Sequence, residues 1–513
     1  MIKKFNFYFD YFLTNSNKIV ELQGEDVIPL PNAMPPEFYI SLQNKIPKET
    51  NDFYHGYYMN PGGWARELRL IEYFRECKEI NFEIKNIQDT VEKNEYNWYV
   101  IEITDVRSIT IANPLTNIPK NTIKFIKEND LKILLWCPFQ DIIYYKDDLK
   151  WDNIFKKDSS LVESESDIFR LYSIYEFLRY YDIKFENLYL RHHTLNYSEV
   201  IEKLSLIYPQ IENLSQMNIL PTNGCLWEYV FYLYKEGYQP MFSHLKENRK
   251  SLDEIDLSKP RKKWFMSLNG YVKPHRVRLL AELKSRNILD KGYCSLIGMP
   301  FEYDFDDSGN PLRYNREELD ELLVLIDKGM GGYHWAHVDN LIEETKFIVE
   351  NIPMLVDGYT FHDNDKALPV DNILDSYFSI ITETTMDPLY TNDAERIDRD
   401  KFIYSLLISE KTYKPLYYMH PFIVLGCPGT LKYLRSIGFE TFPEFFDESY
   451  DDIYDNEKRY RFCLREIKKL CNKDLKEVHE LYQSIIPKLK HNKEMIEQYD
   501  FKKELERWFS YEN

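Results

Sequence analysis

Two stretches in the second half of the chain carry charged side chains where an anion could bind. The segment SLNGYVKPHRVR places Lys273, His275 and Arg276 where a strand gives way to a helix. Cations at a helix N-terminus oppose the helix dipole, and an anion among them removes that conflict. Backbone N–H groups and an arginine together make a phosphate site. Taken alone, this segment fits a phosphate site and a solvated surface equally well.

The second stretch is SEKTYKPLYYMHPFIVLG, residues 409–426. Ser409 can cap the helix that follows, and the dipole favours Glu410 in the first turn, so a structural role explains both. Lys411 is harder to explain this way, and a lysine there suits a diphosphate as a point charge. Glu383 ends the expected strand SYFSIITE, where it is either a solvated cap or an acceptor for sugar hydroxyls. For each of these features alone the structural interpretation is favoured.

Strands that alternate with helices are expected to position these residues. Such alternation predicts parallel sheets with crossover helices. In doubly wound folds, ligands bind at the carboxyl ends of the strands, and all the residues above lie just after strands or at helix starts. The expected strands are 97–104, 131–139 and 185–193 in the first half, and 263–269, 293–298, 376–384 and 421–426 in the second.

The length of 513 residues suits more than one domain. The polar, charged segment 241–262 predicts a boundary near residue 255. We expect an N-terminal α/β domain over 1–255 and a Rossmann-like domain over 256–455. The helical tail, 456–513, is expected to pack back toward the N-terminal domain.

Composition narrows the class of protein. A formal net charge of -19 argues against a protein that grips nucleic acid mainly through phosphates. Seven cysteines without a CxxC spacing predict a reduced, intracellular protein. No run approaches the roughly 18 apolar residues of a membrane helix, so no membrane partner is expected. The expected location is the cytoplasm, which is the host cytoplasm if the source is a virus.

Taken in order, three motifs resemble the fucosyltransferases. KKWFMSLNGYVKPHRVRLLAELKSRNILDKGY is similar to that family's strand ending in Ser-Asn with an arginine on the next helix. FSIITET resembles its Phe-x-Ile/Leu-x-x-Glu-Asn motif. SEKTYKPLYYMHPFIVLG resembles its Thr/Ser-Glu-Lys helix, which is followed by Pro-Val/Ile and Gly. The resemblance covers roughly 263–446.

The resemblance implies a GT-B fold, in which two Rossmann-like domains face a cleft and the C-terminal one binds a nucleotide sugar. It implies that Arg276 and Lys411 hold the diphosphate and that Glu410 takes the ribose hydroxyls. Asn269 and Glu383 would lie near the sugar or the phosphates. The co-substrate would be a GDP- or UDP-linked sugar, with no cofactor and no metal ion.

Two departures bear on the donor. Thr384 stands where the family has Asn, and the gap between Glu383 and Glu410 is much longer than in the family. The donor therefore need not be GDP-fucose. The catalytic base is expected from the N-terminal half, where Asp105 follows a strand.

The sequence therefore predicts a glycosyltransferase acting on an acceptor hydroxyl of a glycan, a protein or a modified base in viral DNA. A catalytically inactive protein of the same fold, serving in structure or binding, is the alternative.

Overall fold

A computed structural model describes most of residues 256–298, 316–354, 370–386 and 406–500, the short pair 304–305 and 311–312, and shorter segments of the N-terminal half. Those shorter segments lie within 5–9, 82–86, 96–102, 120–136, 181–202 and 216–220. The chain forms two compact units. Unit 1 comprises Met1–Gly224, Pro388–Leu406 and Asp500–Asn513, and unit 2 comprises Cys225–Asp387 and Leu407–Tyr499.

Unit 1 is built on a parallel sheet in the order β2-β1-β3-β4-β5-β6. Its centre is apolar: Ile133, Leu134 and Leu135 of β4 have no exposed surface. Trp98 and Tyr189 meet edge to face with ring centroids 4.5 Å apart. The elements are β1 (Phe5–Phe9), β2 (Phe82–Asn86), β3 (Tyr96–Glu102), α6 (Lys120–Glu128), β4 (Lys132–Trp136), η3 (Phe185–Asn187), β5 (Leu188–Arg191) and β6 (Asn218–Ile219).

Unit 2 holds a second parallel sheet in the order β12-β11-β7-β8. Its strands are β7 (Lys263–Tyr271), β8 (Gly292–Gly298), β11 (Ser376–Thr382) and β12 (Phe422–Leu425). Every residue of β11 and β12 is buried, as expected for parallel strands covered on both faces. Phe265 and Phe378 are paired in register and their rings lie 5.8 Å apart.

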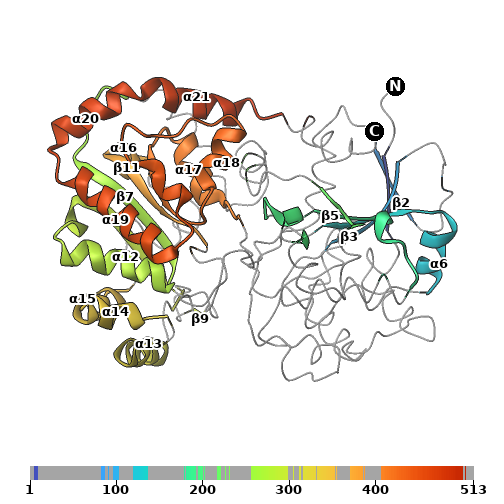
Figure 1. Cartoon of the computed structure of the whole chain (residues 1–513), viewed down its shortest axis with the longest axis horizontal. Coiled ribbons are helices and arrows are strands. Elements are labelled where there is room, and N and C mark those ends of the chain that lie inside the picture. The colour runs from blue at the N-terminus through green and yellow to red at the C-terminus, as the bar shows by residue number, and fades with distance from the viewer. Residues whose placement is uncertain are drawn as a thin grey trace. The chain divides into compact units, whose positions relative to one another are not determined.

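Helices surround this sheet (Figure 1). Helix α19 packs against β12, α20 against β7 and β11, and α17 against β11 and α21. Side-chain caps mark the starts of two of these helices. Asp455 caps α19, and Asp474 forms a capping box with Glu477 at the start of α20. These helices are α12 (Pro274–Ser285), α16 (Val370–Leu374), α17 (Glu410–Tyr417), α18 (Thr430–Ser436), η8 (Glu448–Asp452), α19 (Asn456–Cys471), α20 (Leu475–Ser484) and α21 (Ile486–Glu497).

Three further helices pack as a group on α12 (Figure 1). Trp335, Ala336 and Ile348 bury their side chains in a cluster with Val277 and Leu280 of α12. This group is α13 (Arg316–Lys328), α14 (His334–Val338) and α15 (Ile342–Glu350); a short turn, η5 (Leu289–Lys291), and an antiparallel pair, β9 (Asp304–Phe305) and β10 (Pro311–Leu312), complete the described elements of the unit.

The two sheets share one strand order. In each, the first strand lies between the second and the third: β2-β1-β3-β4 in unit 1 and β8-β7-β11-β12 in unit 2. The direction of winding therefore reverses beside the first strand, between β1 and β3 and between β7 and β11. Doubly wound α/β sheets bind ligands at such a switch point, outside the carboxyl ends of the strands.

The units differ from the expected domains. The chain passes from unit 1 to unit 2 after Gly224 instead of near 255, and Pro388–Leu406 groups with unit 1. Residues of the expected tail up to Tyr499 belong to unit 2, because α19, α20 and α21 pack on its strands and on α17. Among the described helices, none is long and apolar enough to cross a membrane.

Candidate functional site

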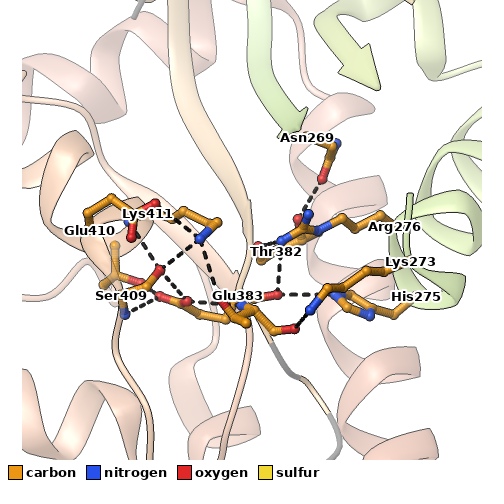
Figure 2. Close-up of polar contacts among 11 residues, drawn as sticks. Asn269, Lys273, His275, Arg276, Thr382, Glu383, Ser409, Glu410 and Lys411 are labelled. Carbon is orange, nitrogen blue, oxygen red and sulfur yellow. Dashed lines mark hydrogen bonds and ion pairs between the residues drawn. The ribbon is translucent and has the colours of Figure 1, made fainter. Parts of the chain in front are cut away.

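The carboxylate of Glu383 is the centre of a polar cluster at the carboxyl edge of the unit 2 sheet (Figure 2). It directly follows β11 and has no exposed surface. Four donors reach it: the Ser409 amide and hydroxyl at 3.1 and 2.6 Å, the Thr412 hydroxyl at 2.6 Å, and the Thr384 amide at 3.2 Å. Both oxygens are therefore occupied by protein groups. Glu383 joins the end of β11 to the first turn of α17.

Ser409 is the N-cap of α17, as its sequence predicts. Its hydroxyl oxygen accepts from the Lys411 amide at 3.3 Å and from Lys411 Nζ at 3.2 Å while it donates to Glu383. Lys411 Nζ also donates to Glu410 Oε1 at 3.1 Å and to Thr384 Oγ1 at 3.3 Å. The cap thus directs the lysine of the first turn toward the end of β11.

The other cations come from the loop after β7 and the start of α12. Lys273 Nζ donates to the Thr384 carbonyl at 2.5 Å, and His275 Nε2 lies 3.1 Å from the Glu383 carbonyl. Arg276 Nη2 lies 3.5 and 3.4 Å from the carbonyls of Thr382 and Glu383. Three segments far apart in sequence, 273–276, 382–384 and 409–411, therefore meet beside the switch point between β7 and β11 (Figure 2).

Positive charge is concentrated here in an acidic protein. Burial, Arg276 and Lys411 lower the pKa of Lys273 to about 8. Burial and the charges of Arg276 and Lys273 lower the pKa of His275 to about 3, so this imidazole is neutral near pH 7. A carbonyl only accepts, so Nε2 of His275 carries the proton it donates to Glu383.

Asn269 links three adjacent strands beneath the cluster. Its Oδ1 accepts from the Thr382 hydroxyl at 2.5 Å, and its Nδ2 donates to the Ser295 carbonyl at 3.1 Å. The backbone amide of Asn269 donates to Ser295 Oγ at 3.2 Å. The side chain of Asn269 on β7 therefore joins β8 to the end of β11.

Burial separates residues that can meet a ligand from residues that support the site. Asn269 and Arg276 are each 1% exposed. The side chains of Lys411 and Glu410 are 28% and 38% exposed, and Lys273 is partly exposed. Lys273, Glu410 and Lys411 are therefore accessible to a ligand. Asn269, Arg276 and Glu383 are buried behind them.

Two supporting residues were not anticipated from the sequence. Arg459 of α19 is 1% exposed, and it donates to the carbonyl of Gly426 at 3.0 Å and of Met386 at 2.7 Å, which follow β12 and β11. A Cβ at Gly426 would lie 3.1 Å from Cγ of Glu383. Gly426 does follow its strand as the sequence indicates, but no local pattern marks it or Arg459 as a neighbour of Glu383.

The structure brings together Asn269, Arg276, Glu383, Glu410 and Lys411, the five residues expected to contact a nucleotide sugar (Figure 2). Asp105, the expected base, lies outside the described residues. Within the described part of the chain, no group of three or more His, Cys, Asp or Glu side chains is arranged to hold a metal ion.

Comparisons with known proteins do not assign the chain to a family. No protein-family model matches the chain, and none of the curated protein sequences compared with it is a significant match.

Proposed function

We propose that unit 2 binds a nucleoside-diphosphate sugar and that the protein is a glycosyltransferase. The observation that carries the proposal is the meeting of 273–276, 382–384 and 409–411 at the carboxyl edge of a parallel sheet. Each segment lies within one of the three motifs that resemble the donor half of the fucosyltransferases. The parallel topology brings these strand ends to one edge, where polar groups of all three motifs lie within hydrogen-bond distance of one another.

The strand orders support the same proposal. Both sheets are parallel, and each places its first strand between its second and third. Two doubly wound units in one chain are what a GT-B arrangement requires, and the cluster occupies the switch point where such sheets bind nucleotides. A GT-B arrangement is therefore part of the proposal.

In the proposed site, Lys411 contacts the diphosphate and Glu410 accepts hydrogen bonds from the ribose hydroxyls. Arg276 lies behind the backbone of Thr382 and Glu383, so it contributes positive potential to the phosphates. Glu383 and Asn269 position the others. As the bond between the sugar and the diphosphate breaks, the diphosphate leaves with the electron pair, and the fixed cations stabilise that charge.

The acceptor hydroxyl forms the new bond to the sugar and loses its proton to a carboxylate general base. We propose that unit 1 supplies this base, with Asp105 as the candidate. The acceptor is a hydroxyl of a glycan, a protein or a modified nucleic acid.

The donor can be identified by thermal-shift measurements of the full chain with GDP-, UDP-, CMP- and TDP-linked sugars. We expect one nucleotide class to raise the melting temperature. A chain that no nucleotide sugar stabilises, and that binds none by calorimetry, would contradict the proposal. Slow hydrolysis of the bound donor then separates an enzyme from a binding protein that has lost catalysis.

Lys411→Met tests the phosphate contact. A charge-assisted hydrogen bond contributes roughly 1.5–3 kcal/mol, so donor affinity should fall about tenfold or more. Lys432→Met is the matched control, because Lys432 is an exposed lysine of the first turn of α18 in the same unit. Equal affinities for the two variants would remove Lys411 from the site.

A further inference from the structure

We propose that Lys273 is a second cation of this site that contacts a bound anion, beside Lys411, and that binding of a phosphate there is accompanied by protonation of its amine. None of the three resembling motifs assigns a role to Lys273. The identification of the natural anion as the diphosphate of a donor rests on the proposed function, whereas the proton uptake is a property of the site itself.

The side-chain amines of Lys273 and Lys411 both contact Thr384. Lys273 Nζ donates to the carbonyl of Thr384 at 2.5 Å, and Lys411 Nζ donates to the hydroxyl of the same threonine at 3.3 Å. Lys273 approaches from the loop after β7 and Lys411 from the first turn of α17. An anion that reaches Lys411 beside Thr384 therefore lies within the field of Lys273.

Among the described residues of this cluster, the cations Lys273, Lys411 and Arg276 outnumber the carboxylates Glu383 and Glu410 (Figure 2). Arg276 adds a third cation on α12, while His275 beside it is neutral near pH 7. Of the two carboxylates, Glu410 is paired with Lys411 and Glu383 accepts four hydrogen bonds from other groups. The carbonyl of Thr384 gives Lys273 a hydrogen bond without a counter-charge.

These neighbours therefore destabilise the protonated amine of Lys273. Burial and the repulsion of Arg276 and Lys411 bring its pKa to about 8, with Glu383 acting in the opposite sense. A bound phosphate favours the charged form and raises that pKa. By linkage, binding near pH 8 takes up protons, and affinity falls as the pH rises through this value.

Inorganic pyrophosphate is the probe, because it contains the phosphates without a nucleoside. Its binding to the full chain at pH 8 is measured calorimetrically in buffers of different ionisation enthalpy, which yields the protons taken up. About half of the Lys273 amines are neutral at that pH. We expect the parent to take up as much as about half a proton more than Lys273→Arg, whose charge does not titrate there.

Lys273→Met supplies a second readout, with an expected loss of affinity of about tenfold or more. Lys262→Met is its control, since Lys262 is an exposed lysine at the opposite end of β7. Melting curves confirm that each variant folds. Equal proton uptake by the parent and Lys273→Arg would overturn the inference, as would unchanged affinity of Lys273→Met.

The experiments can disprove either proposal without disproving the other. If pyrophosphate does not bind but a nucleotide sugar does, the proposed function survives and the role of Lys273 is wrong. If pyrophosphate binds with the expected proton uptake but no nucleotide sugar binds, the anion site stands and the glycosyltransferase proposal fails.

Discussion

Ser409 donates both its backbone amide and its hydroxyl to the carboxylate of Glu383, at 3.1 and 2.6 Å. The two residues are separated by a segment, Pro388–Leu406, that belongs to the other compact unit. The contact therefore holds together the points where the chain leaves unit 2 and returns to it. It also fixes the first turn of α17, and with it Glu410 and Lys411.

Glu383→Gln should destabilise the protein. The amide nitrogen of glutamine donates, so it opposes at least one of the donors that now reach the carboxylate, and the remaining bonds lose their charge assistance. We expect a loss of at least about 2 kcal/mol in the free energy of unfolding, measured by urea denaturation. Glu410→Gln is the control, since that side chain is 38% exposed and its replacement should shift the midpoint little. A parent-like midpoint for Glu383→Gln would show that the four bonds contribute nothing net.

Gly426→Ala should disturb the same carboxylate by crowding it. The new Cβ would lie 3.1 and 3.2 Å from Cγ and Cβ of Glu383, and Glu383 is held by four hydrogen bonds that resist its displacement. Overpacking of this kind costs about 1–3 kcal/mol. Gly270→Ala is the matched control, because a Cβ there meets nothing within 4 Å. Urea denaturation should separate the two variants, and equal midpoints would contradict the packing argument.

The sequence predicts the strands of unit 2 well, because parallel strands covered on both faces are short apolar runs. The run SYFSIIT became β11 and FIVL became β12. Helix ends were harder to predict. The run HRVRLLAELKSRNIL predicts a helix over 275–289, but α12 ends at Ser285, and Asn287 just beyond it takes a positive φ of 56°. From the sequence alone Gly292 is interpreted as the stop of that helix, but it begins β8, and a side chain there would meet the ring of Phe265.

The sequence predicts that the residues of the candidate site lie close together, but it does not predict how they contact one another. Parallel topology brings strand ends to one edge, so the approach of Glu383 to Glu410 and Lys411 followed from element order. The number of donors on Glu383 did not follow, because Ser409 and Thr412 come 26 and 29 residues later. Burial of Arg276 likewise depends on packing of whole elements. The spacing of residues along the sequence does not indicate such contacts.

Acid should destabilise unit 2 through His420. This side chain has no exposed surface; its Nε2 donates to the Ser376 carbonyl at 2.6 Å and its Nδ1 lies 2.7 Å from Ser379 Oγ. Burial and the charge of Arg261 lower its pKa to about 3. The unfolded chain therefore binds the extra proton below about pH 6.5, and stability falls as the pH falls from there toward 3.

The measurement is the free energy of unfolding between pH 7.5 and 4.5 for the parent and for His420→Gln. One titrating group contributes a slope of at most about 1.4 kcal/mol per pH unit. We expect the variant to be less stable at pH 7.5 but to lose less stability on acidification. Parallel curves for the two proteins would show that His420 does not titrate on unfolding.

Glu410→Gln distinguishes a ligand from a helix-terminal residue. As a first-turn acid only, Glu410 contributes roughly 0.3–1 kcal/mol through the helix dipole. As a ribose ligand it accepts hydrogen bonds from two hydroxyls, and its replacement should lower donor affinity about tenfold or more while melting barely changes. Glutamine keeps the shape and most of the helix propensity, and Ser409 still caps the helix. Calorimetric titration of the nucleotide sugar found in the donor screen, run beside a melting curve, gives both quantities. A lowered melting temperature with unchanged affinity would make Glu410 an ordinary helix-terminal acid and would remove the ribose contact from the proposed site.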